Sequence, residues 1–218
     1  MRNSLSLCAA VVLGSMMVGC AHEAEKATTA SQMATQASPA KVAATKMALR
    51  DLWLGHIQSI RNVAVATVDN NTAAREAAEG AVVANAKQIA GSIEPFYGKP
   101  ASEKLFTLLA GHYAGVREHL DATVAGNASG QEAAVKHITE NAGEISSFLS
   151  GANPKNWPKD AVMGLLGAHA AHHIQQFQQL KAGDYVHEGD TWAGMKSHIY
   201  VVADTLTTGL AVQFPDKF

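Results

Sequence analysis

The feature of this sequence that most constrains its fold is an internal repeat. Three histidines, each following Leu and Gly within three residues, are spaced 56 and 57 residues apart and form a first set: His56, His112 and His169. A second set has the same spacing, and each member lies 29 residues after its partner in the first set: Asn85, Asn141 and His198. A repeat of this length is typical of tandem helical units.

Apolar residues recur at helical spacing in six segments, and strand-like alternation is absent from the sequence. Turn-forming residues stand midway between the paired positions, near Asn70, Gly126 and Gly183. Residues at equal distances from the turn of an antiparallel helix pair lie at the same height. The sequence therefore predicts an all-α fold, a six-helix bundle built from three tandem helical hairpins of about 56 residues.

All six repeated residues should then lie in one layer of the bundle. The expected pairs across each hairpin are His56 with Asn85, His112 with Asn141, and His169 with His198. Residues three, four and seven positions away share the helix face of each member, and they are mainly apolar. We therefore expect the layer to face the interior.

Inward imidazoles at one height provide the nitrogen ligands that Zn and Cu prefer. His172 follows His169 by three residues, so the two share a helix face and can chelate one ion. We expect a transition metal ion, Zn or Cu, with this ligand set: His56, His112, His169, His172 and His198. The carboxamides of Asn85 and Asn141 are expected between the imidazoles as further contacts. A second layer of histidines is expected next to the first: His119, His137 and His173.

Two other interpretations of the same residues stay open at this point. In one, the six polar residues hydrogen-bond one another, His to Asn across each hairpin, and only fix the register of the helices. In the other, two facing histidines hold a noncovalent haem. The metal site is favoured over haem.

Sequence motifs for catalysis are missing. The chain contains no Glu-x-x-His pair of the di-iron bundles, no His-Glu-x-x-His, no phosphate-binding loop and no dinucleotide-binding glycine motif. No catalytic residue is therefore predicted, and binding is favoured over enzyme activity.

The N-terminus has the pattern of a bacterial lipoprotein leader. Arg2 precedes an apolar run over residues 5–18, which has the charge step and length of a secretory signal. Cys20 then stands where such leaders are cleaved and lipidated, so we expect a signal peptide over residues 1–19 and a lipid anchor on Cys20. An ordinary signal cleaved elsewhere, with Cys20 incidental, is the alternative.

Residues 20–41 contain few large apolar side chains, so they cannot offset their ordering entropy and are expected to form a flexible tether. Residues 42–218 are expected to form the helical bundle domain. Ala21, rather than Asp, follows the cysteine, which favours the outer membrane as the location, with the bundle facing the periplasm. In a host with a single membrane, the bundle would face outward.

The overall composition limits the classes of partner that the sequence indicates. The chain has 17 Lys and Arg residues against 19 Asp and Glu residues, so no nucleic-acid partner is expected. Of its two cysteines, Cys8 lies inside the expected signal peptide and Cys20 would carry the lipid, which excludes disulfides and thiolate metal sites from the mature protein. The membrane, reached through the lipid on Cys20, is the one partner that the sequence indicates.

Several short stretches resemble a family of small bacterial helical-bundle proteins. They are LRDLW at 49–53 with His56, PFYG at 95–98, ANP at 152–154 with NWP at 156–158, and QFPDKF at 213–218. This family is uncharacterised, so the resemblance implies a compact helical domain from about residue 49 onward and no reaction. The family pattern also tends to have His at the positions of His56, His112, His169 and His198. The leader and the additional His172 and His173 depart from it.

Overall fold

Six long helices occupy most of the chain in the computed structural model, which describes residues 36–218. Their bounds are α2 (Pro39–Val68), α3 (Thr72–Gly91), α5 (Lys99–Val124), α6 (Ala128–Ala152), α7 (Lys159–Ala182) and α8 (Tyr185–Gln213). Two short elements complete this part, the one-turn helix α4 (Glu94–Tyr97) and the 3-10 helix η1 (Pro215–Lys217). Residues 36–218 contain no strand, so the predicted all-α fold class is confirmed.

The predicted leader lies outside the described residues. This applies to the signal peptide over residues 1–19, to Cys20 and to the expected tether as far as residue 35. The tether does not reach residue 41 as predicted, because α2 already begins at Pro39. Proline is preformed for the first position of a helix, and Val42 packs against the core. Over residues 36–218, no helix combines the length and apolarity that crossing a membrane requires.

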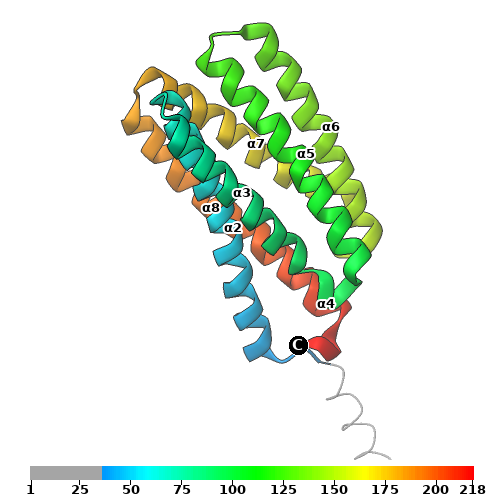
Figure 1. Ribbon diagram of the computed structural model, residues 1–218. Helices are drawn as coiled ribbons and strands as arrows, with labels where there is room; N and C mark the ends of the chain where they lie inside the picture. Colours follow the sequence, from blue (N-terminus) through cyan, green and yellow to red (C-terminus); the bar gives the residue numbers. More distant parts are fainter. Residues whose placement is uncertain (1–35) are drawn as a thin grey trace, which may run out of the picture. The chain divides into compact units, whose positions relative to one another are not determined.

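Consecutive helices pair into three hairpins: α2 with α3, α5 with α6, and α7 with α8 (Figure 1). The three turns lie toward the same end of the bundle, at the top of Figure 1. The turn residues Asn70, Gly126 and Gly183 have positive φ angles of 54°, 68° and 72°. Glycine and asparagine tolerate this left-handed conformation, which ends the first helix of each hairpin.

The residue after each positive-φ position is the N-cap of the next helix. The side chains of Asn71, Asn127 and Asp184 each accept a hydrogen bond from the backbone N–H three residues later. Such N-caps satisfy one of the free donors at a helix start. The turns therefore repeat with the same spacing as the histidines, and they lie where the sequence predicted them.

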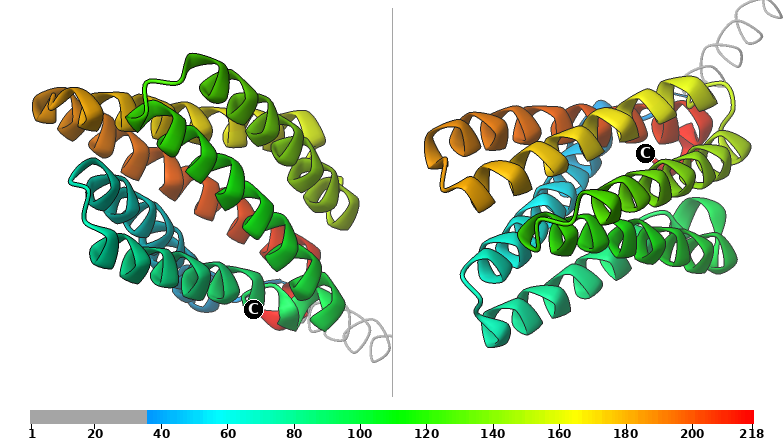
Figure 2. Two further views of the ribbon diagram at one scale, coloured as in Figure 1. Left: turned by 45° about the horizontal axis from the view of Figure 1, so that its top comes forward. Right: turned by 90° about the horizontal axis from the view of Figure 1, so that it is seen from above.

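The hairpins are arranged with approximate threefold symmetry. The first helices of the hairpins, α2, α5 and α7, contact one another and form the inside of the bundle. Each second helix packs on the outside of two first helices: α3 on α2 and α5, α6 on α5 and α7, and α8 on α7 and α2 (Figure 2). Equivalent residues of the first helices therefore meet along a central axis.

An aromatic cluster closes the end of the bundle opposite the hairpin turns. The Tyr97 ring lies 6.2 Å from the ring of Trp157 and 5.2 Å from that of Phe214. Trp157 packs on the backbone of α8 at Gly209, where an added Cβ would lie 2.1 Å from the indole Nε1. Three of the stretches that carry the family resemblance, at 95–98, 156–158 and 213–218, thus meet here and have a structural role.

Candidate metal centre

The first set of histidines meets on the central axis. His56 comes from α2, His112 from α5 and His169 from α7, and all three are buried. Their ring centroids are 6.2 Å apart for His56 and His112, 5.4 Å for His56 and His169, and 5.8 Å for His112 and His169. The threefold arrangement of the hairpins produces this nearly equilateral triangle. The first-set residues therefore do face the interior at one height.

A fourth imidazole joins the triangle from α7. The ring centroid of His173 lies 4.6 Å from that of His169 and 6.2 Å from that of His56. The repeat places Ile60 and Val116 at the equivalent positions of the other two hairpins. His173 thus replaces an apolar core residue in one hairpin only. We call His56, His112, His169 and His173 the histidine cluster.

The cluster has the proximity that a metal site needs. One ring nitrogen each of His56, His169 and His173 lies within 4.8 Å of the other two. From the sequence, His173 was expected in a second layer and was not among the candidate ligands. The sequence did contain a signal for His173, because the repeat aligns it with Ile60 and Val116. A histidine at a position that is apolar in the other repeats requires a polar partner in the core.

Several ring nitrogens of the cluster have no hydrogen-bond partner among the described residues. They are both nitrogens of His169, both nitrogens of His173, and Nδ1 of His112. A neutral imidazole carries one donor and one acceptor, and each buried polar atom without a partner costs about 1–3 kcal/mol. An ion bound among these nitrogens would remove part of that cost.

Burial keeps the cluster neutral. It lowers the pKa of His56 to about 3 and that of His112 to about 4. Burial, and then the neighbouring imidazoles, lower the pKa of His169 and of His173 well below the usual value. Desolvation disfavours the charged form of each ring, and the cluster contains no carboxylate to offset it. Neutral imidazole is also the form that coordinates a metal.

The second set does not form the hydrogen bonds to the first set that the polar-layer interpretation requires. The side-chain nitrogens of Asn85, Asn141 and His198 instead donate to the backbone carbonyl 33 residues earlier, on Leu52, Leu108 and Leu165. Each of these carbonyls lies one turn before a first-set histidine. Asn85 and Asn141, which were expected as contacts between the imidazoles, thus link the two helices of their hairpins.

Glycines make these ties possible in the first two hairpins. A Cβ added at Gly55 would lie 3.1 Å from Nδ2 of Asn85, and one added at Gly111 would lie 2.9 Å from Nδ2 of Asn141. Only a residue without a side chain lets the amide approach the neighbouring helix this closely. The His–Asn hydrogen bonds of the polar-layer interpretation are therefore replaced by bonds from the amide nitrogens to backbone carbonyls.

His172 and His198 lie apart from the cluster, although both were predicted as ligands. Their rings stack on each other with centroids 5.5 Å apart, in partly buried positions between α7 and α8. Nδ1 of His172 contacts the carbonyl of Ala168 at 2.8 Å. Successive residues of a helix are rotated by about 100°, so the face that aims His173 at the axis turns His172 away from it.

The expected second layer is formed only in part. His119 is buried, with its ring centroid 6.2 Å from that of Phe177, and burial lowers its pKa. His137 instead lies at the surface, where its Nδ1 is 2.9 Å from Oε2 of Glu118. Of the three histidines expected in this layer, His119 and His173 therefore face the interior.

The carboxylate of Glu188 is also buried, and it was not singled out from the sequence. Arg61 donates two hydrogen bonds to Glu188, at 2.7 and 2.8 Å, and Gln176 donates a third at 2.8 Å. The Arg61 guanidinium is the main cause that lowers the pKa of Glu188. This carboxylate is ionised, and its hydrogen bonds to side chains of α2 and α7 link α8 to both of these helices. Its position beside the α7–α8 turn gave no sign of burial.

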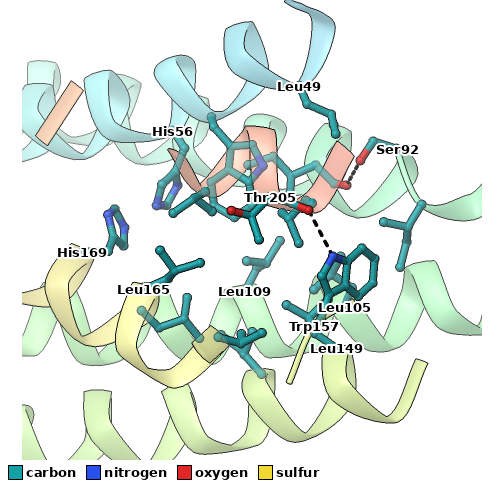
Figure 3. Close-up of a pocket in the computed structure, with 18 of the residues that line it drawn as sticks. Leu49, His56, Ser92, Leu105, Leu109, Leu149, Trp157, Leu165, His169 and Thr205 are labelled. Atoms are coloured by element: carbon teal, nitrogen blue, oxygen red, sulfur yellow. Dashed lines mark hydrogen bonds between the residues drawn. The ribbon is translucent and has the colours of Figure 1, made fainter. Parts of the chain in front are cut away.

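An apolar cavity of about 60 Å³ adjoins the histidine cluster on the axis. His56 and His169 lie at one end of it and Trp157 at the other (Figure 3), and His112 also lines it. The remaining lining is almost entirely aliphatic. The site therefore combines a polar cluster with an apolar space on one side.

Comparisons of the chain with protein-family models, with curated proteins and with solved structures found no match. The resemblance of the short stretches to a bacterial helical-bundle family therefore stays a prediction, and the function has to be argued from the geometry of the site.

Proposed function

We propose that the histidine cluster binds one transition metal ion, Zn or Cu, and that the protein holds or buffers this ion. His56, His169 and His173 are the ligands in this proposal, and His112 supplies a fourth nitrogen beside them. The observation that carries the proposal is a group of three buried, neutral imidazoles whose ring nitrogens lie within 4.8 Å of one another.

The spacing of the nitrogens is compatible with coordination after small movements. Zn–N bonds are about 2.0–2.1 Å long, so two imidazole nitrogens on a tetrahedral ion are about 3.3 Å apart. Side chains that start within 4.8 Å reach this separation by shifts of about an ångström, mainly in χ angles. Three histidines with one further position is a ligand set that suits both Zn and Cu.

The two other interpretations are less well supported. A hydrogen-bonded polar layer would require His–Asn contacts, but Asn85 and Asn141 bond to backbone carbonyls and leave the cluster without them. Haem needs a pocket of the size of other small-molecule sites, about 300–1,000 Å³. The cavity beside the cluster has about 60 Å³.

We further propose that the protein is exported and anchored to the outer membrane through a lipid on Cys20, with the bundle in the periplasm. Arg2, the apolar run at 5–18 and Cys20 support this part of the proposal. Changing Cys20 to Ala should release the protein from the membrane fraction or stop its processing. Unchanged partition into the membrane fraction would overturn the anchor and leave the metal site untouched.

Calorimetry of the untagged chain tests the metal site. An ion that binds only the folded state adds about 4 kcal/mol of stability when free metal is about a thousand times its dissociation constant. We therefore expect Zn or Cu to raise the unfolding temperature at neutral pH relative to chelator. His169→Ala should abolish most of this gain, whereas His187→Ala, at an exposed position beside Asp184, should retain it. Equal stability with metal and with chelator would refute the site.

A further inference from the structure

The cavity is a product of the repeat. Two layers of equivalent residues from the first helices surround it on the axis: Leu49, Leu105 and Val162, and then Trp53, Leu109 and Leu166. The next layer along the axis is the first set of histidines. Equivalent residues of the second helices complete the wall: Ile89, Ile145 and Val202. The apolar layers thus leave a space of about 60 Å³ that ends at three imidazoles.

Three other polar groups in the wall are already used. Ser92 Oγ donates to the carbonyl of Ile89 at 2.6 Å, and Trp157 Nε1 donates to the carbonyl of Thr205 at 3.3 Å (Figure 3). The hydroxyl of Thr205 donates to the carbonyl of Val201 at 2.8 Å. These three groups therefore leave no free donor for a bound molecule. A charged occupant would lose its hydration without compensation.

The volume limits the size of an occupant. An engineered apolar cavity of about 150 Å³ holds benzene or xenon and stays free of water. The present cavity, at about 60 Å³, is less than half as large. It accommodates a diatomic gas or a molecule of a few non-hydrogen atoms, and an apolar wall gives water too few partners to fill it.

We propose that this cavity is a binding site for a small, uncharged, apolar molecule, and that the bound molecule contacts the first set of histidines at one end. The proposal goes beyond metal binding and stands without it, because the cavity wall consists of the protein's own side chains. In the metal-loaded protein the molecule would lie next to the ion.

Xenon is a suitable probe, because it is apolar, uncharged and indifferent to metal. We expect saturable xenon binding by the chelator-treated chain in ¹²⁹Xe NMR. Leu109→Phe, which adds volume in the cavity wall, should weaken this binding by at least about tenfold. Leu108→Phe is the matched control, because Leu108 is the neighbouring buried residue of α5 and does not line the cavity. It should change xenon affinity by less than about twofold.

Val202→Leu fills the same cavity from α8 and keeps the test decisive if Leu109→Phe does not fold. Circular dichroism identifies the folded variants. Absence of saturable xenon binding by the wild-type chain, or equal binding by wild type and a folded filling variant, would overturn the proposal. Because chelator is present throughout, these outcomes do not depend on whether the cluster binds metal.

Discussion

Two adjacent histidines of α7 show that the position of a residue on its helix decides whether it joins the histidine cluster. His173 points to the central axis and completes the histidine cluster, whereas His172 stacks on His198 between α7 and α8. A spacing of three residues from His169 favoured His172 from the sequence alone. In the folded protein His173, rather than His172, faces the axis. The direction of the axis depends on how the three hairpins pack, and the spacing of residues within one helix gives no information on that packing.

This difference gives a test within one helix. His173→Ala should weaken Zn binding by on the order of 100-fold or more, because changes even outside the ligand shell of a metal cost about 10–100-fold. His172→Ala should weaken it by less than about tenfold. Competition with a fluorescent zinc chelator at neutral pH measures both affinities. An equal loss in the two variants would contradict the assignment of His173.

At the level of the helices, the repeat predicted the hairpins and their turns, because turn residues and caps are local signals. Asn70, Gly126 and Gly183 are visible as such in the sequence. The role of the second set was not predictable in the same way. Asn85 and Asn141 reach backbone carbonyls only because Gly55 and Gly111 allow close approach of two helices, which is a property of the packed pair.

The tie between α5 and α6 can be broken by one methyl group. Gly111→Ala places a Cβ 2.9 Å from Nδ2 of Asn141, which must shift and weaken its bond to Leu108. We expect a loss of about 1–3 kcal/mol in the free energy of unfolding. Gly143→Ala on α6 is the control, because no neighbouring atom lies within 4 Å of the added Cβ. It should stabilise the protein by up to about 1 kcal/mol, since alanine is the better helix former.

Urea unfolding of both variants measures these changes. Similar stabilities of Gly111→Ala and Gly143→Ala would show that the Asn141 tie contributes nothing, whatever the distance in the structure.

At the level of the whole molecule, the threefold arrangement concentrates histidines that are neutral when folded. The pKa of His56 is about 3 and that of His112 about 4 in the folded protein. The unfolded chain has a histidine pKa of about 6.5 and therefore binds more protons over this range. The stability of the metal-free protein is fully present above about pH 6.5 and is lost as the pH falls toward the folded-state values.

Each such histidine contributes a slope of up to about 1.4 kcal/mol per pH unit. Between pH 6.5 and pH 5, His56 and His112 together should lower the free energy of unfolding by about 3 kcal/mol. Urea titrations of the chelator-treated protein at several pH values measure this slope. His112→Leu removes one titrating group and should reduce this slope by up to about 1.4 kcal/mol per pH unit. A stability that does not change over this range would mean that the cluster is hydrated or already protonated in the folded state.

The fold class and the inward direction of the first set followed from the sequence, because a repeat with apolar helical spacing allows few arrangements. Which helices line the axis did not follow, since six similar amphipathic helices can pack in several orders. The positions of His173 and Glu188 depend on that order. The site was therefore predictable as a layer of histidines but not as this particular cluster.

Elemental analysis of the untagged chain, purified from its native compartment, tests metal binding by the histidine cluster most directly. We expect about one Zn or Cu ion per chain, in keeping with a single site of three or four ligands. A folded variant carrying His169→Ala and His173→Ala should have lost this ion. A wild-type chain that contains no transition metal, or a double variant that retains the same content, would contradict metal binding by the histidine cluster.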